Sequence, residues 1–388
     1  MRYIRFLKTP RIVRQKGSSK TNISCLITIT SDLGDSFLPY DLTLAVELLH
    51  VSEENDEENL VVWKTTQWLG GMRSLAITLP IGKSHRAWPL RIRVGADPKA
   101  KFDELESLLQ NDDFRGVVSA WSGLVDPTNG IDVAERFVQR RFEAGAHLPL
   151  HINEETGESI ARHLWDAGIL LACRIGKLIR DCRHDGLVPL QDGHKRLQVV
   201  ELGTGCGIVG LTLAKIIPSS DVVLTDLPEA SEIVQRNLEG SRSTLQGTAQ
   251  FKELDWESDL PDPLSINPTT CQHCRQMDIV VAADCTYNAD SSPVLVSTIQ
   301  KIVETSPRAL IIIAMKRRHT SEEIFFDFMS KAGFKTADVQ KFPLPGDENA
   351  GEEEVEIYMY QHKGENRNEV PRSAQCDSEA REELYNLP

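Results

Sequence analysis

Apolar residues in the first quarter of the chain form short runs that turn-forming or acidic segments separate. The runs are rich in β-branched residues, which favour strands. They cover residues 23–29, 42–48, 60–63, 75–79 and 90–94. This pattern predicts a small β-rich domain over residues 1–98, built as an antiparallel sheet or sandwich.

Beyond residue 98 the apolar residues change to a helical spacing. They recur at intervals of three and four, as they do on one face of a helix. The residues with this spacing are Phe102, Leu105, Leu108, Leu109, Val133, Phe137, Val138 and Phe142. We therefore expect residues 99–149 to form a helical connector, or an extension that covers a site in the following domain.

From residue 150 onward, strand-like runs alternate with helical patterns. The runs cover residues 199–202, 221–227, 249–254, 278–283, 309–315, 335–342 and 355–360. Most of them are continuously apolar, which is typical of strands buried on both faces of a parallel sheet. The sequence predicts an α/β fold over residues 150–362: a doubly wound, mostly parallel seven-stranded Rossmann-like sheet whose last strand is antiparallel. Residues 363–388 are polar and charged, and we expect a disordered tail there.

Composition and charge narrow the choice of partners. The chain has 388 residues and a net charge of -14, which disfavours nucleic acid and would suit a basic protein. Its eight cysteines show no disulfide-framework spacing. The N-terminus lacks the apolar core of a signal peptide, and no run reaches the roughly 18 apolar residues of a membrane span. These features predict a protein of the cytoplasm or the nucleus, without a membrane partner.

The most informative segment is a strand that breaks into closely spaced glycines between Glu201 and Gly207. Glycines let a nucleotide-like group approach backbone N–H groups, and they tolerate positive φ. The dinucleotide pattern G-x-G-x-x-G needs a third glycine where Ile208 stands, and Glu201 would repel a pyrophosphate. S-adenosylmethionine has no phosphate and carries an ammonium group that suits Glu201. The loop therefore favours this cofactor over NAD, with another nucleotide fold as the alternative.

Two further strand ends carry candidate adenosine contacts. Asp226 follows the glycines by about 20 residues, where a carboxylate accepts both ribose hydroxyls; a helix cap is the competing role. Asp255 and Trp256 end the next strand, where the carboxylate could meet the adenine amino group and the indole could stack on the ring. Trp256 could also be an ordinary core residue.

A single C-x-x-C pair, Cys271 and Cys274, lies in a polar loop. A structural zinc site needs four ligands, so we expect no metal there.

The fourth strand of this region ends in D-x-x-Y, from Asp284 to Tyr287. Together with the strand ends above and the segment Leu164-Trp165-Asp166-Ala167, it resembles one methyltransferase family over about residues 150–362. This is family 16 of the class I, seven-β-strand, S-adenosylmethionine-dependent methyltransferases, the lysine methyltransferase-like group. The chain is similar to a fungal-type member with an N-terminal extension.

This resemblance implies S-adenosylmethionine as cofactor and assigns its contacts. The cofactor-binding residues would be Trp165, Glu201, Gly203, Thr204, Gly205, Asp226, Leu227, Asp255, Trp256 and Ala283. Asp284 and Tyr287 would be the catalytic residues that face the acceptor amine. The implied function is methylation of a lysine side chain on a protein substrate. The alternatives are a small-molecule or nucleic-acid methyltransferase, and a binding protein that keeps the cofactor fold without catalysis.

Overall fold

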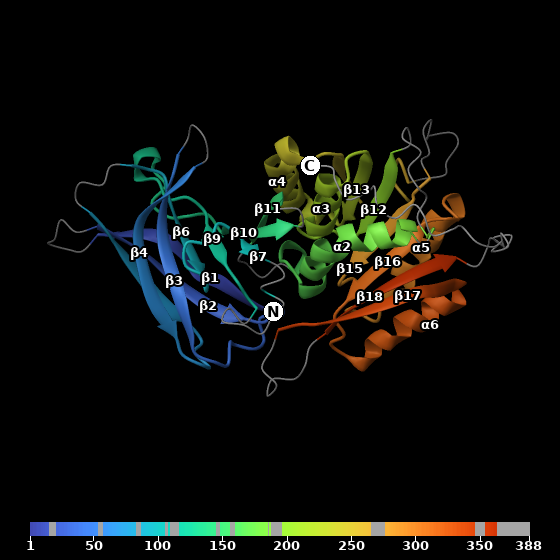
Figure 1. The fold of residues 1–388 in the computed structure, drawn as a ribbon, viewed down its shortest axis with the longest axis horizontal. Helices are drawn as coiled ribbons and strands as arrows, with labels where there is room; N and C mark the ends of the chain where they lie inside the picture. The colour runs from blue at the N-terminus through green and yellow to red at the C-terminus, as the bar shows by residue number, and fades with distance from the viewer. Residues whose placement is uncertain are drawn as a thin grey trace, which may run out of the picture.

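Two β-sheet assemblies lie side by side along the long axis of the molecule (Figure 1). The structure is a computed structural model. It describes residues 1–14, 21–52, 57–82, 87–104, 108, 116–144, 148–155, 160–184, 186–187, 196–264, 276–345 and 354–362. Cys271, Cys274 and the tail over residues 363–388 lie outside the described residues, so the predictions for them stay predictions.

The N-terminal assembly consists of two sheets that share an apolar core. One sheet has the strand order β5-β2-β1-β8, and the other β11-β10-β9-β6-β3-β4. The first six strands are β1 (Arg2–Arg14), β2 (Thr21–Thr30), β3 (Leu42–Val51), β4 (Glu58–Trp68), β5 (Leu75–Ile81) and β6 (Leu90–Gly95). Ile23 and Ile27 of one sheet pack in the same buried cluster as Leu44 and Val46 of the other. Alternating inward-facing residues of this kind are what a two-sheet core requires.

The expected helical connector over residues 99–149 is wrong for the described residues from 116 to 149, which continue the sheets, and β11 carries the N-terminal assembly past residue 150, where the sequence predicts the start of the α/β domain. They form β8 (Val117–Val118), β9 (Ala120–Ser122), β10 (Phe137–Ala144) and β11 (Leu148–Glu155), while β7 (Asp103–Glu104) pairs with β10. In β10 the most deeply buried positions, Val138, Arg140 and Phe142, alternate as in any strand, and Arg141 between them is 7% exposed. Arg140 is buried because it forms an ion pair with Glu154 of β11. Because Arg140 is charged, the apolar residues of β10 do not alternate strictly in the sequence, and their remaining spacing of three and four residues resembles that of a helix.

The second assembly is a seven-stranded sheet with the order β14-β13-β12-β15-β16-β18-β17. Its strands are β12 (Leu197–Leu202), β13 (Ser220–Asp226), β14 (Thr248–Glu253), β15 (Ile279–Ala283), β16 (Leu310–Met315), β17 (Phe334–Pro343) and β18 (Glu354–His362). Neighbours from β14 to β16 are parallel, and β18 is antiparallel to both β16 and β17. The prediction of a Rossmann-like α/β fold is confirmed.

Helices cover both faces of this sheet. They are α2 (Asp166–His184), α3 (Ile208–Ile216), α4 (Ser231–Ser241), α5 (Ser292–Thr305) and α6 (Ile324–Lys331). The first three pack in one buried cluster, and α5 and α6 pack in another on the opposite face. Strand residues alternate between the clusters: Val199 joins the first, whereas Val200 joins the second. Among the described helices, none is long and apolar enough to span a membrane.

The two assemblies are in direct contact. Met1, Tyr3 and Phe142 belong to the same buried cluster as residues of α2 and α3. At the edge of the N-terminal assembly, the backbone N–H of Asn153 in β11 donates to Oδ1 of Asn237 in α4 at 2.7 Å. This packing brings the N-terminal strands close to the carboxyl ends of the strands in the second sheet.

Candidate functional site

A cavity of about 400 Å³ lies at the carboxyl ends of β12, β13, β14 and β15. This volume is within the range of small-molecule sites, and the carboxyl edge of a parallel sheet is where such folds bind ligands. All twelve residues that the sequence singled out line it. They are Trp165, Glu201, Gly203, Thr204, Gly205, Asp226, Leu227, Asp255, Trp256, Ala283, Asp284 and Tyr287.

The glycine loop between β12 and α3 adopts a backbone that side chains would strain. Gly203, Gly205 and Gly207 have φ of 64°, 55° and 83°, in the left-handed region that favours glycine. A Cβ at Gly203 would lie 2.5 Å from Sγ of Cys285. Glycine at this position therefore lets the loop lie close against the end of β15.

Glu201 lies buried at the end of β12, beneath this loop. One carboxylate oxygen accepts the Thr204 hydroxyl at 2.6 Å and the backbone N–H of Gly210 at 2.9 Å. Burial raises the pKa of Glu201 to about 8, and the nearby charge of Asp226 adds to this rise. Among the residues that the structure describes, Glu201 has no ion pair. A cationic ligand would supply the missing partner and stabilise the carboxylate.

Asp226 ends β13 and is tied to the loop rather than to a cation. Its carboxylate oxygens accept the backbone N–H groups of Gly205 at 2.7 Å and Leu227 at 2.8 Å. Each oxygen keeps a second lone pair, which could accept one hydroxyl of a ribose. Burial raises the pKa of Asp226 despite these two hydrogen bonds.

Asp255 and Trp256 follow β14 at the rim of the cavity. Asp255 is exposed and accepts the backbone N–H of Glu257 at 3.0 Å, whereas Trp256 is half-buried. The six-membered ring of the Trp256 indole lies against Gly203, with one ring carbon 3.4 Å from the position of a Cβ there. The indole is therefore a wall of the cavity and also part of the local packing.

Trp165 lines the cavity from the segment just before α2, which begins at Asp166. The guanidinium of Arg318 lies over the Trp165 ring, 5.4 Å from its centroid. Asp166, in the first turn of α2, is fully buried and accepts the Tyr3 hydroxyl at 2.7 Å.

Asp284 differs from Glu201 and Asp226 because it is ion-paired. It has a φ of 55°, which is unusual for a residue with a side chain. Its carboxylate accepts the backbone N–H of Ala167 at 3.1 Å, the backbone N–H of Lys316 at 3.2 Å and Nη1 of Arg318 at 2.9 Å. Burial still raises the pKa of Asp284, although Arg318 acts in the opposite direction. Tyr287, at the cavity mouth, is 54% exposed.

Sequence reasoning missed the residues that surround Asp284. Arg318 follows β16 in a basic run over residues 316–319. Asp32, from the loop after β2, accepts Nη2 of Arg318 at 2.7 Å. His163 also lines the cavity. The run of four basic residues at 316–319, directly after a buried strand, is the feature of the sequence that could have indicated a role for Arg318. Nothing in the sequence indicated Asp32.

Among the described residues, no group of three or more His, Cys, Asp or Glu side chains could hold a metal ion.

The fold and cavity together define a class of protein. The sheet order reverses between β12 and β15, and the cavity lies at this point, as in nucleotide-binding α/β folds. The carboxylate of Glu201, buried beneath the glycine loop, disfavours a phosphate there. The class is therefore an α/β protein that binds a phosphate-free, cationic nucleoside.

Comparisons with known proteins identify the family. A family model described as lysine methyltransferase matches residues 145–332. EEF1A lysine methyltransferase 3 of Mus musculus is 30% identical over 185 residues, which cover 47% of this chain and 67% of that protein. A UPF0665 family protein of Schizosaccharomyces pombe is 28% identical over 324 residues, which cover 83% of this chain and 91% of that one. Among solved structures, a magnesium protoporphyrin IX methyltransferase from Synechocystis with bound SAM matches at a TM-score of 0.33 and 14% identity, over 53% of this chain and 86% of that chain.

The chain belongs to the lysine methyltransferase family, so it is an enzyme and its cofactor is S-adenosylmethionine. The match to the yeast protein is longer than the stretch from residue 145 to the end of this chain. It therefore includes part of the N-terminal strands.

Proposed function

We propose that the enzyme methylates the ε-amino group of a lysine on a protein substrate, and that the cavity holds the cofactor and the acceptor at opposite ends. The observation that carries the proposal is the contrast between the carboxylates of the cavity. Glu201 is buried and Asp226 is partly buried, and neither has an ion pair among the described residues, so they suit an ammonium group and two ribose hydroxyls. Asp284 and Tyr287 lie at the end of β15 and would face the acceptor.

The remaining cofactor contacts follow from this orientation. Asp255 and Trp256 would hold the adenine, because they follow β14 on the far side of Asp226. Gly203, Thr204 and Gly205 would pass close to the nucleoside. The other predicted contacts are Trp165 and Ala283 at the methionine end and Leu227 beside the ribose.

Bound S-adenosylmethionine supplies a methyl group on a sulfonium, which the lone pair of an uncharged acceptor nitrogen takes in an in-line displacement. The contribution of the chain is to position the acceptor. Holding two reactants in line supplies several kcal/mol of effective concentration. The acceptor lysine, with an ordinary pKa of about 10.4, must first lose its proton. A partly apolar cavity favours that loss because burial disfavours the charged form of a lysine.

Labelling tests the function directly. The purified enzyme would be incubated with S-adenosylmethionine labelled in the methyl group and with cell lysate, and samples would then be treated with protease or nuclease. We expect the label to be sensitive to protease and to appear as methyl-lysine after acid hydrolysis. Because the mouse relative carries EEF1A in its name, EEF1A is the first purified acceptor to test. Label that resists protease but is lost with nuclease would overturn the protein-lysine proposal. Cofactor binding without any transfer would favour a non-catalytic role.

We also propose that the enzyme works in the cytoplasm or the nucleus. The described cysteines, Cys25, Cys173, Cys182, Cys206 and Cys285, carry free thiols, which fits a reducing compartment. Fractionation of cells that express a tagged chain would test this location.

A further inference from the structure

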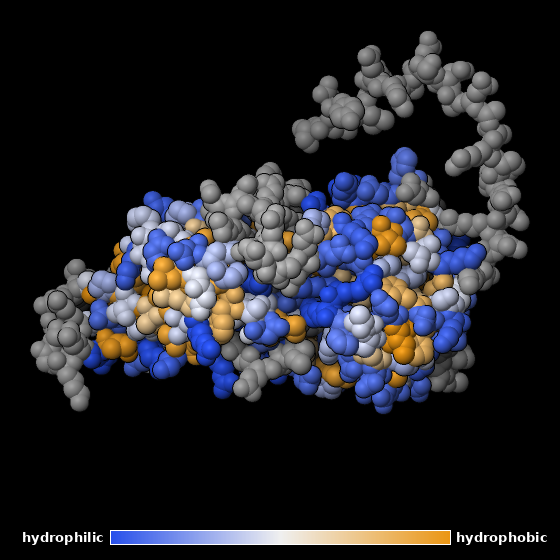
Figure 2. All heavy atoms as spheres, turned by 90° about the horizontal axis from the view of Figure 1, so that it is seen from below, coloured by the Kyte–Doolittle hydropathy of each residue, from blue (hydrophilic) through white to orange (hydrophobic). Residues whose placement is uncertain are grey.

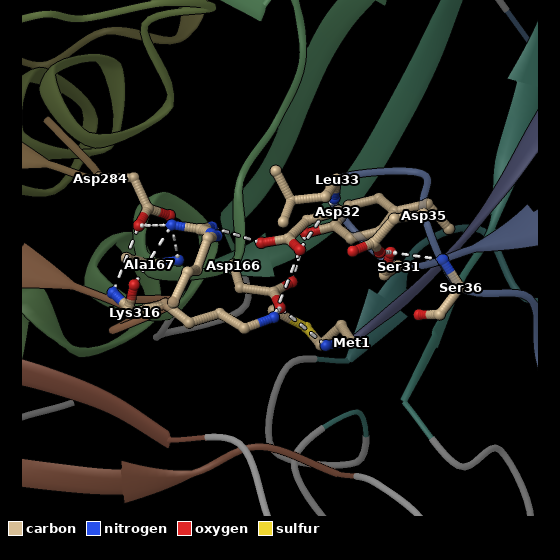
Figure 3. A network of polar contacts seen from close by, with 12 residues as sticks. Met1, Ser31, Asp32, Leu33, Asp35, Ser36, Asp166, Ala167, Asp284 and Lys316 are labelled. Carbon is tan, nitrogen blue, oxygen red and sulfur yellow. Dashed lines mark hydrogen bonds and ion pairs between the residues drawn. The ribbon is translucent and has the colours of Figure 1, made fainter. Parts of the chain in front are cut away.

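A cluster of charged side chains joins the N-terminal strands to the end of β15 (Figure 3). Asp32 lies in the loop between β2 and β3, and its side chain is 1% exposed. It accepts Nη2 of Arg318 at 2.7 Å and Nζ of Lys316 at 3.3 Å. The backbone carbonyl of Asp32 accepts Nη2 of Arg5 at 2.8 Å, which fixes the loop on β1. The contact with Arg5 therefore holds Asp32 in place independently of Arg318.

Arg318 connects this loop to the candidate catalytic carboxylate. Its two terminal nitrogens bind different acids: Nη2 binds Asp32, and Nη1 binds Asp284 at 2.9 Å. The guanidinium also lies over Trp165. Asp284 and Trp165 both line the cofactor cavity. Arg318 itself, together with Asp32, lines a second cavity of about 470 Å³ that opens between the two assemblies. The guanidinium thus lies directly behind the wall that the acceptor would touch.

Other charged groups surround this arrangement on every side. Asp166 accepts Nζ of Lys316 at 2.9 Å and the α-amino group of Met1 at 2.9 Å. The side chain of Glu322 accepts the backbone N–H of Arg318 at 3.1 Å. Tyr3 donates its hydroxyl to Asp166 at 2.7 Å, Nη1 of Arg5 lies 3.5 Å from Nδ1 of His163, and Cys285 and Tyr287 follow Asp284 along the chain. Hydrophilic side chains also gather in the middle of the molecule when it is seen from below (Figure 2).

We propose that Arg318 is a positioning residue that holds Asp284 and keeps the acceptor lysine uncharged, and that Asp32 of the N-terminal strands fixes Arg318 for this task. The inference rests on the proposed lysine acceptor. It gives the N-terminal strands a direct role in the transfer step.

The physical reason is the charge balance around the acceptor nitrogen. A carboxylate alone would attract a lysine in its ammonium form, which has no lone pair and cannot accept a methyl group. Arg318 offsets the charge of Asp284, so the pair still offers an oxygen to an amine N–H but attracts a second cation less strongly. The ammonium proton leaves to solvent on binding, the nitrogen lone pair forms the N–CH₃ bond, and the S–CH₃ bond breaks. The product is a methylammonium whose charge replaces that of the sulfonium.

The decisive experiment compares pH profiles of kcat for Arg318→Gln, Arg318→Lys and the neighbouring control Arg317→Gln. The acceptor is the protein that the labelling experiment identifies. Removing the nearby cation should raise the pKa of the bound lysine, so the acid limb for Arg318→Gln should move to higher pH by about one unit or more. At pH 7 its kcat should fall about tenfold with an unchanged or lower KM, and the loss should shrink at high pH.

Arg318→Lys should return the acid limb of the pH profile of kcat to its wild-type position. Arg317→Gln, which loses contacts with Glu356, Tyr358, Glu323 and the Phe326 ring but none with Asp32 or Asp284, should match the wild type.

A second pair of variants tests the link to the N-terminal strands. Asp32→Asn should lower kcat about tenfold while the acid limb does not move upward, because Arg318 keeps its charge but loses its anchor. Asp35→Asn is the matched control in the same loop, since Asp35 accepts the Ser31 hydroxyl at 2.6 Å, whereas Asp32 is the residue that accepts Arg318. Calorimetry with S-adenosylhomocysteine should give the same affinity for all five variants and verifies that each is folded.

The outcomes separate this inference from the proposed function. If Arg318→Gln loses the same factor of kcat at every pH, the role in acceptor ionisation is refuted while lysine methylation stands. If Asp32→Asn and Asp35→Asn have equal rates, the role of the N-terminal strands is refuted. If the wild type transfers no methyl group to protein, the proposed function fails and this inference fails with it.

Discussion

The two ends of the cavity use carboxylates in opposite ways. At the proposed cofactor end, Glu201 is buried and Asp226 is partly buried, their hydrogen bonds come from backbone N–H groups and one hydroxyl, and neither has an ion pair within the described chain. At the proposed acceptor end, Asp284 is buried like Glu201 but has Arg318 at 2.9 Å. Burial raises the pKa of all three groups.

This difference indicates which partner each carboxylate requires. A buried carboxylate without a cation is costly unless a ligand supplies hydrogen-bond donors or positive charge. The cofactor end therefore gains most when the ligand binds. Asp284 already has its compensating charge, so it can keep one geometry whether or not the acceptor is present. The comparison predicts that variants at the two ends separate binding from turnover.

The largest effect should come from Asp284. Asp284→Asn and Asp284→Ala should lower turnover at saturating cofactor by about 100-fold or more, because the acceptor loses its positioning partner. Cofactor affinity should change by less than about threefold, since Asp284 would not touch the ribose or the ammonium. Methylation rates and calorimetry with S-adenosylhomocysteine measure the two quantities.

Asp290→Asn is the matched control, because Asp290 is exposed and lies just beyond the D-x-x-Y segment. Near-normal turnover in Asp284→Asn would contradict the assignment of the acceptor end to β15. Equal losses of turnover and cofactor affinity would instead place Asp284 among the cofactor contacts.

The two ends also differ in how far the sequence could predict them. The cofactor end is built from strand ends, and each of these follows a run that marks its strand, as Glu201 and Asp226 do. Glycine spacing adds a local backbone requirement that the φ values of Gly203 and Gly205 meet. Such features depend on neighbours within a few residues, so a pattern can indicate them.

The acceptor end depends on contacts between distant segments. Arg318 and Asp32 are separated by 286 positions, and no spacing along the chain relates them. The same limitation explains the wrong connector: Arg140 is buried only because Glu154 lies on the paired strand. Buried charges follow their partners in three dimensions, and a hydropathy pattern cannot indicate those partners.

Asp226 should give the second largest effect, confined to the cofactor end. Asp226→Ala should lower cofactor affinity by about 2 to 3 kcal/mol, because two ribose hydroxyls lose a charged acceptor. Turnover at saturating cofactor should fall much less. Asp221→Asn, at the opposite end of β13, is the control, since Asp221 binds Arg196, Gln198 and Thr248 away from the cavity. Normal affinity in Asp226→Ala would mean that the ribose lies elsewhere.

The smallest expected effect is a pH dependence that belongs to Glu201. The pKa of Glu201 is about 8 without ligand, so the side chain is mostly protonated at pH 6 to 7. The ammonium of the cofactor favours the carboxylate form, so binding in this range should release a proton. Affinity should therefore rise with pH by up to about tenfold per unit. The rise should stop near pH 8, where an α-amino group with an ordinary pKa of about 7.7 to 8.0 loses its own charge.

Calorimetry with S-adenosylhomocysteine in buffers of different ionisation enthalpy measures how many protons are released when the ligand binds. Glu201→Gln should abolish both the proton release and the pH dependence of the affinity. A flat affinity in the wild type, with no proton released, would show that Glu201 does not meet the ammonium group and that the two ends of the cavity are assigned in the wrong order.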